Sequence, residues 1–180
     1  MIRSFIALPI PEDICQKLRL LQFLLPLPAR VEPEDFHLTL AFLGDQPVDR
    51  LEEVHDGLER LAAPPFPMLL EGVGLFGGAK PRIAFAALPP NPALIHLQAK
   101  VARVAVAAGI SIPARGFTPH VTLGRFDPPA PDAALRLERA VAAEQGFRAG
   151  PWLASELVLY ASHPKAKGQR YERLSTYPLA

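Results

Sequence analysis

The sequence predicts a protein of mixed helices and strands, built from two related lobes that face each other. Predicted strands and helices alternate along the 180 residues, of which 49% are apolar, enough to bury a substantial core. A short phrase typical of a β-strand occurs twice, as His37-Leu38-Thr39-Leu40 and His120-Val121-Thr122-Leu123, almost half the chain apart. We therefore expect a single domain over residues 1–180, with lobes of about residues 1–80 and 81–180 between which the chain is free to cross.

The first half alternates apolar runs with helical stripes. Pro11 is placed to open a helix and Pro26 to end it, and between them apolar residues recur at helical spacing. Gly77-Gly78 marks a turn. The predicted elements are a strand over residues 3–8, a helix over 11–25, a strand over 36–43 closed by Gly44, a helix over 47–62, an extended segment over 66–76 and a strand over 82–88.

The second half repeats this plan. Asn91-Pro92 is a capping residue followed by a proline in the first turn, and Gly109 ends that helix. The strand that carries His120 follows, then a helix over residues 132–144. Two closing strands are predicted over residues 152–160 and 170–177, joined by a loop rich in Lys and Gly.

Strand geometry places the polar residues of each phrase together. Side chains alternate between the faces of a strand, so the His and the Thr of each copy emerge on one face. In the first copy the other face is apolar and is expected to lie in the core, Phe36 and Phe42 included. In the second copy Gly124 leaves room for a ligand or for another backbone segment.

These residue types suit acid/base chemistry on a phosphate. An imidazole with an ordinary pKa near 6.5 can hold or release a proton around neutral pH, so one His can supply a proton while the other accepts one. The hydroxyls of Thr39 and Thr122 can donate hydrogen bonds to phosphate oxygens. The remaining histidines, His55, His96 and His163, are expected to be structural or exposed.

Composition excludes several classes of protein. The formal net charge of +1 argues against a broad electrostatic grip on long duplexes. The single cysteine, Cys15, cannot form an internal disulfide and is expected to be a buried thiol. No His-Glu-x-x-His motif or cysteine pair indicates a metal site, and no apolar run reaches the length of a membrane span. We expect a soluble, cytoplasmic monomer that needs no metal and no cofactor.

Longer stretches around the two phrases resemble a known family. HLTLAFLG, PHVTLGR, RSFIAL, GLFGGAKPRIAFAAL and YERLSTYPL together resemble the RNA 2′,3′-cyclic phosphodiesterases, also called bacterial 2′-5′ RNA ligases, of the two-histidine phosphoesterase superfamily. The resemblance implies an α+β fold with two pseudo-symmetric lobes, whose antiparallel-rich sheets and outer helices surround a central cleft. It also implies metal-independent hydrolysis of RNA or nucleoside 2′,3′-cyclic phosphate ends to 2′-phosphomonoesters, together with a reversible 2′-5′ RNA ligase activity in which a ribose hydroxyl replaces water.

The same resemblance implies roles for individual residues. His37 is expected to donate a proton to the departing 3′ oxygen and His120 to accept one from the attacking water. Arg125 follows the second phrase as in the family pattern, although strict alternation puts it on the face opposite His120 unless the strand bulges. Arg30 and Arg82 are further candidates for binding substrate, with a surface or ion-pair role as the alternative for all three arginines.

Two other functions fit the same residues. A non-catalytic RNA-binding or nucleotide-binding module would use the same cleft, and a metal hydrolase would lose its activity in a chelator. Hydrolysis of a cyclic nucleotide in EDTA separates these from the two-histidine enzyme.

Overall fold

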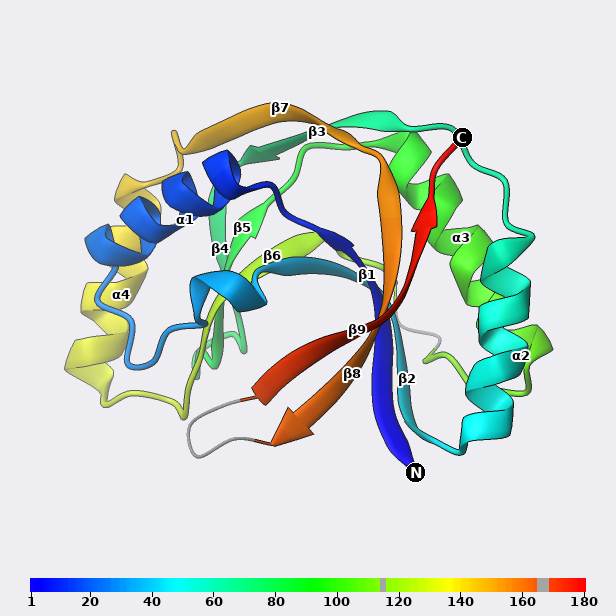
Figure 1. Ribbon diagram of the computed structural model, residues 1–180. Coiled ribbons are helices and arrows are strands. Elements are labelled where there is room, and N and C mark those ends of the chain that lie inside the picture. The colour runs from blue at the N-terminus through cyan, green and yellow to red at the C-terminus, as the bar shows by residue number, and fades with distance from the viewer. Residues whose placement is uncertain (114–115, 165–168) are drawn as a thin grey trace.

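The protein is an α+β fold with two lobes. The computed structural model describes residues 1–113, 116–164 and 169–180. In the first lobe, four antiparallel strands form one sheet in the order β2 (His37–Gln46), β1 (Ile2–Pro9), β8 (Glu156–Pro164) and β9 (Gln169–Pro178). Helices α2 (Val48–Glu59) and α3 (Pro92–Ala107) lie on the side of this sheet shown at the right of Figure 1.

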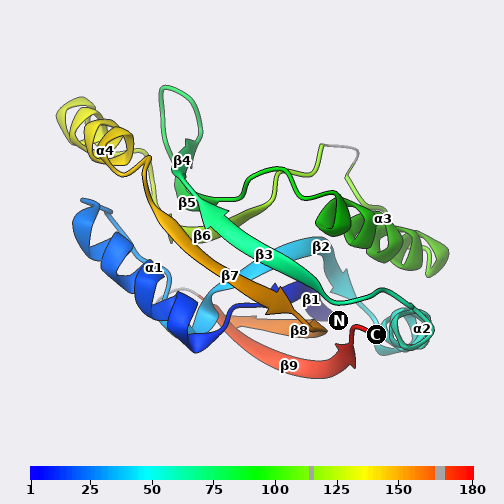
Figure 2. The same ribbon diagram turned by 90° about the horizontal axis from the view of Figure 1, so that it is seen from above.

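The second lobe contains two smaller antiparallel sheets. One has the order β4 (Val73–Phe76), β5 (Ile83–Ala87) and β6 (His120–Arg125), and the other pairs β3 (Phe66–Glu71) with β7 (Arg148–Ala154). Helices α1 (Glu12–Leu24) and α4 (Pro131–Ala143) lie against these sheets on the opposite side of the molecule from α2 and α3, as Figure 2 shows from above. A short 3-10 helix, η1 (Pro33–Asp35), leads into β2.

The chain crosses between the lobes. The four-stranded sheet takes β1 and β2 from the beginning of the chain and β8 and β9 from its end. Helix α1 joins β1 to β2 but contacts β7 of the other lobe, and α3 joins β5 to β6 but contacts β2. Each lobe therefore receives a helix that the sequence places between two strands of the other lobe.

Several boundaries differ from the sequence prediction, and the helix expected to reach residue 62 ends at Glu59. The extended segment over residues 66–76 is two strands, because Gly72 adopts a positive φ of 86° and bends the chain from one sheet into the next. The strand expected over residues 152–160 is divided at Ser155 between β7 and β8. Strand β2 also continues through Gly44, which at a φ of 72° allows a register shift opposite Ser4 and Phe5.

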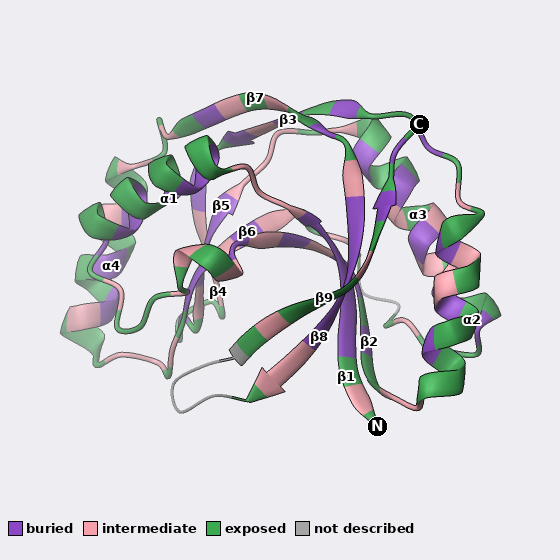
Figure 3. Ribbon diagram, viewed as in Figure 1, coloured by how far each residue is buried: buried purple, intermediate pink, exposed green. Residues whose placement is uncertain are grey.

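The predicted helical stripes are buried. Leu51, Val54 and Leu58 of α2 are buried, as are Leu94, Leu97 and Val101 of α3. One large apolar cluster runs through both lobes (Figure 3). The Asn91 side chain accepts a hydrogen bond from the Leu94 backbone N–H at 3.1 Å, which confirms the predicted cap. No helix in the described part of the chain is long and apolar enough to cross a membrane.

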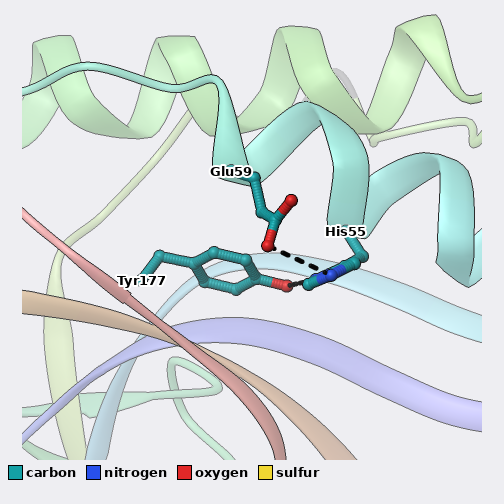
Figure 4. Close-up of polar contacts among 3 residues, drawn as sticks. All are labelled: His55, Glu59 and Tyr177. Carbon is teal, nitrogen blue, oxygen red and sulfur yellow. Dashed lines mark hydrogen bonds and ion pairs between the residues drawn. The ribbon is translucent and has the colours of Figure 1, made fainter.

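A polar cluster attaches α2 to β9 (Figure 4). Nδ1 of His55 lies 2.8 Å from the Tyr177 hydroxyl, and its Nε2 lies 3.4 Å from a Glu59 carboxylate oxygen. With Nε2–H facing the carboxylate, Nδ1 of the neutral ring accepts the hydrogen bond from the tyrosine hydroxyl. Burial raises the pKa of Tyr177, so this hydroxyl keeps its proton. His55 thus has the structural role expected for it.

Candidate functional site

The two motif strands lie next to each other at the junction of the lobes. Strands β2 and β6 are each an edge strand, one of the four-stranded sheet and one of the β4-β5-β6 sheet, and they contact each other. His37 lies at the start of β2 and His120 at the start of β6, so this contact places both histidines at the same junction. The fold therefore brings together two histidines that are almost half the sequence apart.

Each His shares its face with its Thr, as the alternation predicts. In the β1–β2 pairing, His37 is opposite Pro9 and Thr39 opposite Ala7. In the β5–β6 pairing, His120 is opposite Ala87 and Thr122 opposite Phe85. All four motif side chains are half-buried, whereas the leucine or valine between each His and Thr is buried. The polar residues thus face the junction and the apolar residues face the core.

Backbone carbonyls set the orientation of both imidazoles. Nδ1 of His37 lies 2.7 Å from the carbonyl oxygen of Asp35, and Nδ1 of His120 lies 2.7 Å from that of Thr118. A carbonyl oxygen can only accept, so each Nδ1 carries the proton in the neutral ring. Nε2 of each histidine is then the atom that can accept a proton from a substrate or, once protonated, donate one.

Aromatic rings enclose both histidines. The His37 ring centroid lies 4.7 Å from that of Phe5 and 5.1 Å from that of Tyr171, which it meets edge-on. The His120 ring centroid lies 5.0 Å from that of Phe76 and 5.5 Å from that of Phe85, again edge-on. These rings limit the movement of each imidazole and exclude water from its sides.

Burial shifts the proton affinity of both rings. Loss of solvation, reinforced by the charge of Arg125, lowers the pKa of His37 to about 4 even though the Asp35 carbonyl favours the protonated form. The same two causes lower the pKa of His120. Both histidines are therefore neutral at pH 7 in the free protein, and a bound anion would favour protonation by offsetting the arginine charge.

Arg125 faces the same side as His120 because β6 contains a bulge. Gly124 is opposite Ala84 and Thr122 is opposite Phe85, so Leu123 is an extra residue in the register. The extra residue reverses the alternation, and Arg125, opposite Ile83, emerges on the face of Thr122. The bulge precedes Gly124. The space beside this glycine is filled by the backbone of Ala29, because a Cβ at position 124 would collide with the Ala29 carbonyl oxygen.

The expectation that Phe42 lies in the core is wrong, for the same reason. Leu40 is an extra residue between Thr39, opposite Ala7, and Ala41, opposite Ile6. The alternation reverses there, and Phe42 is 57% exposed on the face of His37, whereas Phe36 is buried as predicted. Phe42 in β2 thus corresponds to Arg125 in β6.

A cavity of about 430 Å³ lies beside His37. Both Phe42 and Arg125 line it, which places the aromatic ring and the guanidinium on one hollow surface. The sequence did not predict the other lining residues, because β1, β8 and β9 come together only in the fold. The one local indication is that Arg3 and Phe5, two residues apart in β1, emerge on the same face of the strand. Those other lining residues are Arg3, Ser4, Phe5, Gly44, Ser162 and Tyr171.

His120, Thr39 and Thr122 are not among the residues that line this cavity, and neither are Arg30 and Arg82. Arg30 is exposed in the loop before β2, and an Arg82 guanidinium nitrogen lies 3.8 Å from an Asp127 carboxylate oxygen at the surface. Cys15 is buried as expected, and burial raises its pKa to about 11, so it remains a thiol. Among the described residues, no three His, Cys, Asp or Glu side chains are grouped so that they could hold a metal ion.

Comparisons with known proteins identify the family. The model of the 2′-5′ RNA ligase superfamily matches residues 9–165. An RNA 2′,3′-cyclic phosphodiesterase from Thermus thermophilus is 32% identical over 158 residues, which cover 83% of this chain and 74% of the relative. One from Geobacillus stearothermophilus is 33% identical over 159 residues, covering 86% of this chain but 49% of the relative, so the chain spans about half the length of that protein.

Solved structures share the fold over nearly the whole chain. A crystal structure of a Thermus thermophilus protein has a TM-score of 0.77 at 29% identity and covers 98% of this chain and 97% of its own. Escherichia coli LigT complexed with 3′-AMP has a TM-score of 0.80 at 24% identity and covers 99% and 98%, a likeness of fold. The family-model match over residues 9–165 and the 32% identical Thermus thermophilus relative show that the chain belongs to the 2′-5′ RNA ligase superfamily.

Proposed function

We propose that this chain hydrolyses RNA or nucleoside 2′,3′-cyclic phosphates to 2′-phosphomonoesters by two-histidine acid/base catalysis. The observation that carries the proposal is that each His-x-Thr strand directs an Nδ1-anchored imidazole at the junction of the lobes, beside Arg125. The RNA 2′,3′-cyclic phosphodiesterases among its relatives support the same activity. Two imidazoles, a guanidinium and two hydroxyls on the facing strands support the proposal.

In the proposed reaction, the cyclic phosphate lies between the two histidines. Water attacks phosphorus while Nε2 of His120 takes its proton, and the bond from phosphorus to the 3′ oxygen breaks on the opposite side. Nε2–H of His37 gives its proton to that oxygen, leaving a 2′-phosphate. Thr39 and Thr122 donate hydrogen bonds to the non-bridging oxygens, and the charge of Arg125 stabilises the negative charge that they carry in the transition state. Attack by a ribose 5′ hydroxyl in place of water, with the same 3′ oxygen leaving, would form a 2′-5′ linkage.

The proposed substrate supplies the proton affinity that the free site lacks. Both histidines are neutral at pH 7 in the free protein, but the reaction needs one of them protonated. Burial is the main cause that lowers both pKa values and the charge of Arg125 adds to it, so a phosphate anion near Arg125 offsets the second of these causes. We infer that substrate enters as an anion and brings the acid into its protonated form, and that the adjoining nucleoside lies in the cavity beside Phe42.

Hydrolysis of a nucleoside 2′,3′-cyclic phosphate in EDTA tests the function. We expect turnover to a 2′-nucleotide, and a loss of about 10²- to 10⁴-fold in kcat for either His37→Ala or His120→Ala. His96→Ala, which removes an exposed histidine of α3, is the matched control and should keep full activity. Binding without turnover would instead support a binding module, and activity that returns only with added zinc or manganese would support a metal hydrolase.

The two roles are separable with a modified leaving group. In a substrate with sulfur in place of the bridging 3′ oxygen, the sulfur leaves as a thiolate and needs no proton. This substrate should restore turnover to His37→Ala but not to His120→Ala. Restoration of His120→Ala instead would exchange the two roles.

A further inference from the structure

The two motif strands share an irregularity that alternation alone does not predict. Each has a bulge at the fourth residue of the motif, Leu40 in β2 and Leu123 in β6, and β2 has a second register shift before Gly44. The burial pattern over the first six residues is also the same in both strands, with two consecutive buried residues followed by an exposed one. That exposed residue is Phe42 in β2 and Arg125 in β6. Both side chains lie at the cavity because of the bulges.

A glutamine binds the carbonyl group of each bulge residue. Nε2 of Gln22, in α1, donates hydrogen bonds to the carbonyl oxygens of Leu123 at 2.8 Å and Val31 at 2.9 Å. Nε2 of Gln98, in α3, donates to the carbonyl oxygen of Leu40 at 3.3 Å. The helix that approaches each bulge is the one that crosses from the other lobe. The same fold feature therefore reaches both bulges in the same way.

Gln22 joins the bulge of β6 to the loop that precedes β2. Its side chain is 4% exposed on an otherwise apolar stripe of α1, and Ser4 and Gln22 are the buried polar residues of the described chain. Burying an amide is unfavourable unless it is hydrogen-bonded, and both of its bonds go to the segment around the bulge. The Val31 backbone N–H also donates to the Leu123 carbonyl oxygen, at 2.9 Å, so this oxygen is held from two sides.

We propose that Gln22 and Gln98 are positioning residues, each of which fixes one bulge and thereby directs one side chain at the substrate. Gln22 acts through Arg125 on the phosphate, and Gln98 acts through Phe42 on the nucleoside. Without the bulge, strict alternation would turn Arg125 or Phe42 to the opposite face. This assignment rests on the proposed function, which supplies the substrate that these side chains meet.

Double-mutant cycles test each link. We expect Gln22→Met to lower kcat/KM for a nucleoside 2′,3′-cyclic phosphate by about 10- to 100-fold, the scale on which small misplacements act. Added to Arg125→Ala, it should cost less than about twofold more, since a residue that acts through another has no effect in its absence. Added to Phe42→Ala, it should keep its full effect. Gln98→Met should give the reverse pattern and should mainly raise KM.

A general loss of folding would not produce this pattern. Gln145→Met is the matched control, because Nε2 of Gln145 also donates to two backbone carbonyl oxygens, of Val73 and Val141, but contacts neither bulge. It should leave kcat/KM unchanged. If Gln22→Met does not fold, the milder Gln98→Met carries the same test through Phe42. Equal losses from Gln22→Met with and without Arg125 would overturn the proposal.

Failure of the proposed function can be told apart from failure of this inference. If the wild-type protein hydrolyses no cyclic phosphate, the function is wrong, and titration with inorganic phosphate still tests the link. Gln22→Met should then weaken phosphate binding as much as Arg125→Ala does, with no further loss in the double variant. An unchanged dissociation constant in Gln22→Met would refute the link whatever the reaction.

Discussion

Replacing Gly124 by alanine tests the packing behind the candidate site. A Cβ at this position would collide with the carbonyl oxygen of Ala29, whose segment is held against β6 by the bond from the Val31 N–H to the Leu123 carbonyl oxygen. Backbone cannot yield as a flexible side chain can, so the loop or the bulge must move. Overpacking costs about 1–3 kcal/mol, and losing that hydrogen bond costs about 0.5–1.5 kcal/mol more.

The expected loss in free energy of unfolding is therefore about 2–4 kcal/mol. For a domain of this size, 1 kcal/mol changes Tm by about 2–4 °C, so Gly124→Ala should melt about 5–15 °C below the wild type. Circular dichroism measures Tm, and kcat/KM is measured well below it, where a moved bulge should also lower activity through Arg125. Gly146→Ala is the control, because a Cβ at Gly146 meets no atom within 4 Å. A Tm for Gly124→Ala within about 2 °C of the wild type would refute the packing argument.

Three further predictions follow from burial and contacts. In NMR titrations, His37 should titrate near pH 4 in the free protein and at higher pH with inorganic phosphate. Because the pKa of His37 in the unfolded chain is near 6.5, the stability present above pH 6.5 should decrease toward pH 4 in denaturant melts. Titration of His37 near pH 6.5 in the free protein would contradict the lowered pKa and the loss of stability that follows from it. Phe42→Ala should raise KM for a cyclic nucleotide about 5- to 100-fold through lost base stacking, whereas Phe23→Ala, at an exposed position of α1, should not; equal KM values would exclude stacking. Tyr177→Phe should lower Tm by about 2–4 °C through loss of the bond to His55, with kcat/KM unchanged, and an unaltered Tm would show that this bond adds no stability.

The local sequence pattern was sufficient to predict the helices and strands and the two His-Thr pairs of the candidate site. Helical spacing and capping residues located α1 to α4, and strand alternation placed His37 with Thr39 and His120 with Thr122. Alternation failed at Phe42 because a strand pattern contains no information about which of its own residues is left without a partner. Its face depends on the register against β1, which only the folded sheet determines.

The sequence did not predict which distant strands pair with each other either. Arg3 and Tyr171 line the cavity because β1 pairs with β8 and β8 with β9, joining the two ends of the chain. The pairing of β3 with β7 also joins segments far apart in sequence, and the turn at Gly72 depends on it: the N–H of Gly72 donates to the Phe147 carbonyl oxygen at 2.9 Å, just before β7 begins. Such contacts depend on which elements meet, and propensity describes each element by itself.

The exchange of α1 and α3 between the lobes has a consequence for dissection of the protein. A cut between α2 and β3 would leave an N-terminal fragment whose α1 has lost β7 and whose β2 has lost α3. The C-terminal fragment would lack the same contacts from the other side. Each fragment alone would expose the apolar face of one helix and one uncovered strand. When the two fragments are mixed, each should restore the contacts that the other has lost. His37 and Thr39 lie in the first fragment and His120 and Thr122 in the second, so neither fragment alone holds the complete candidate site.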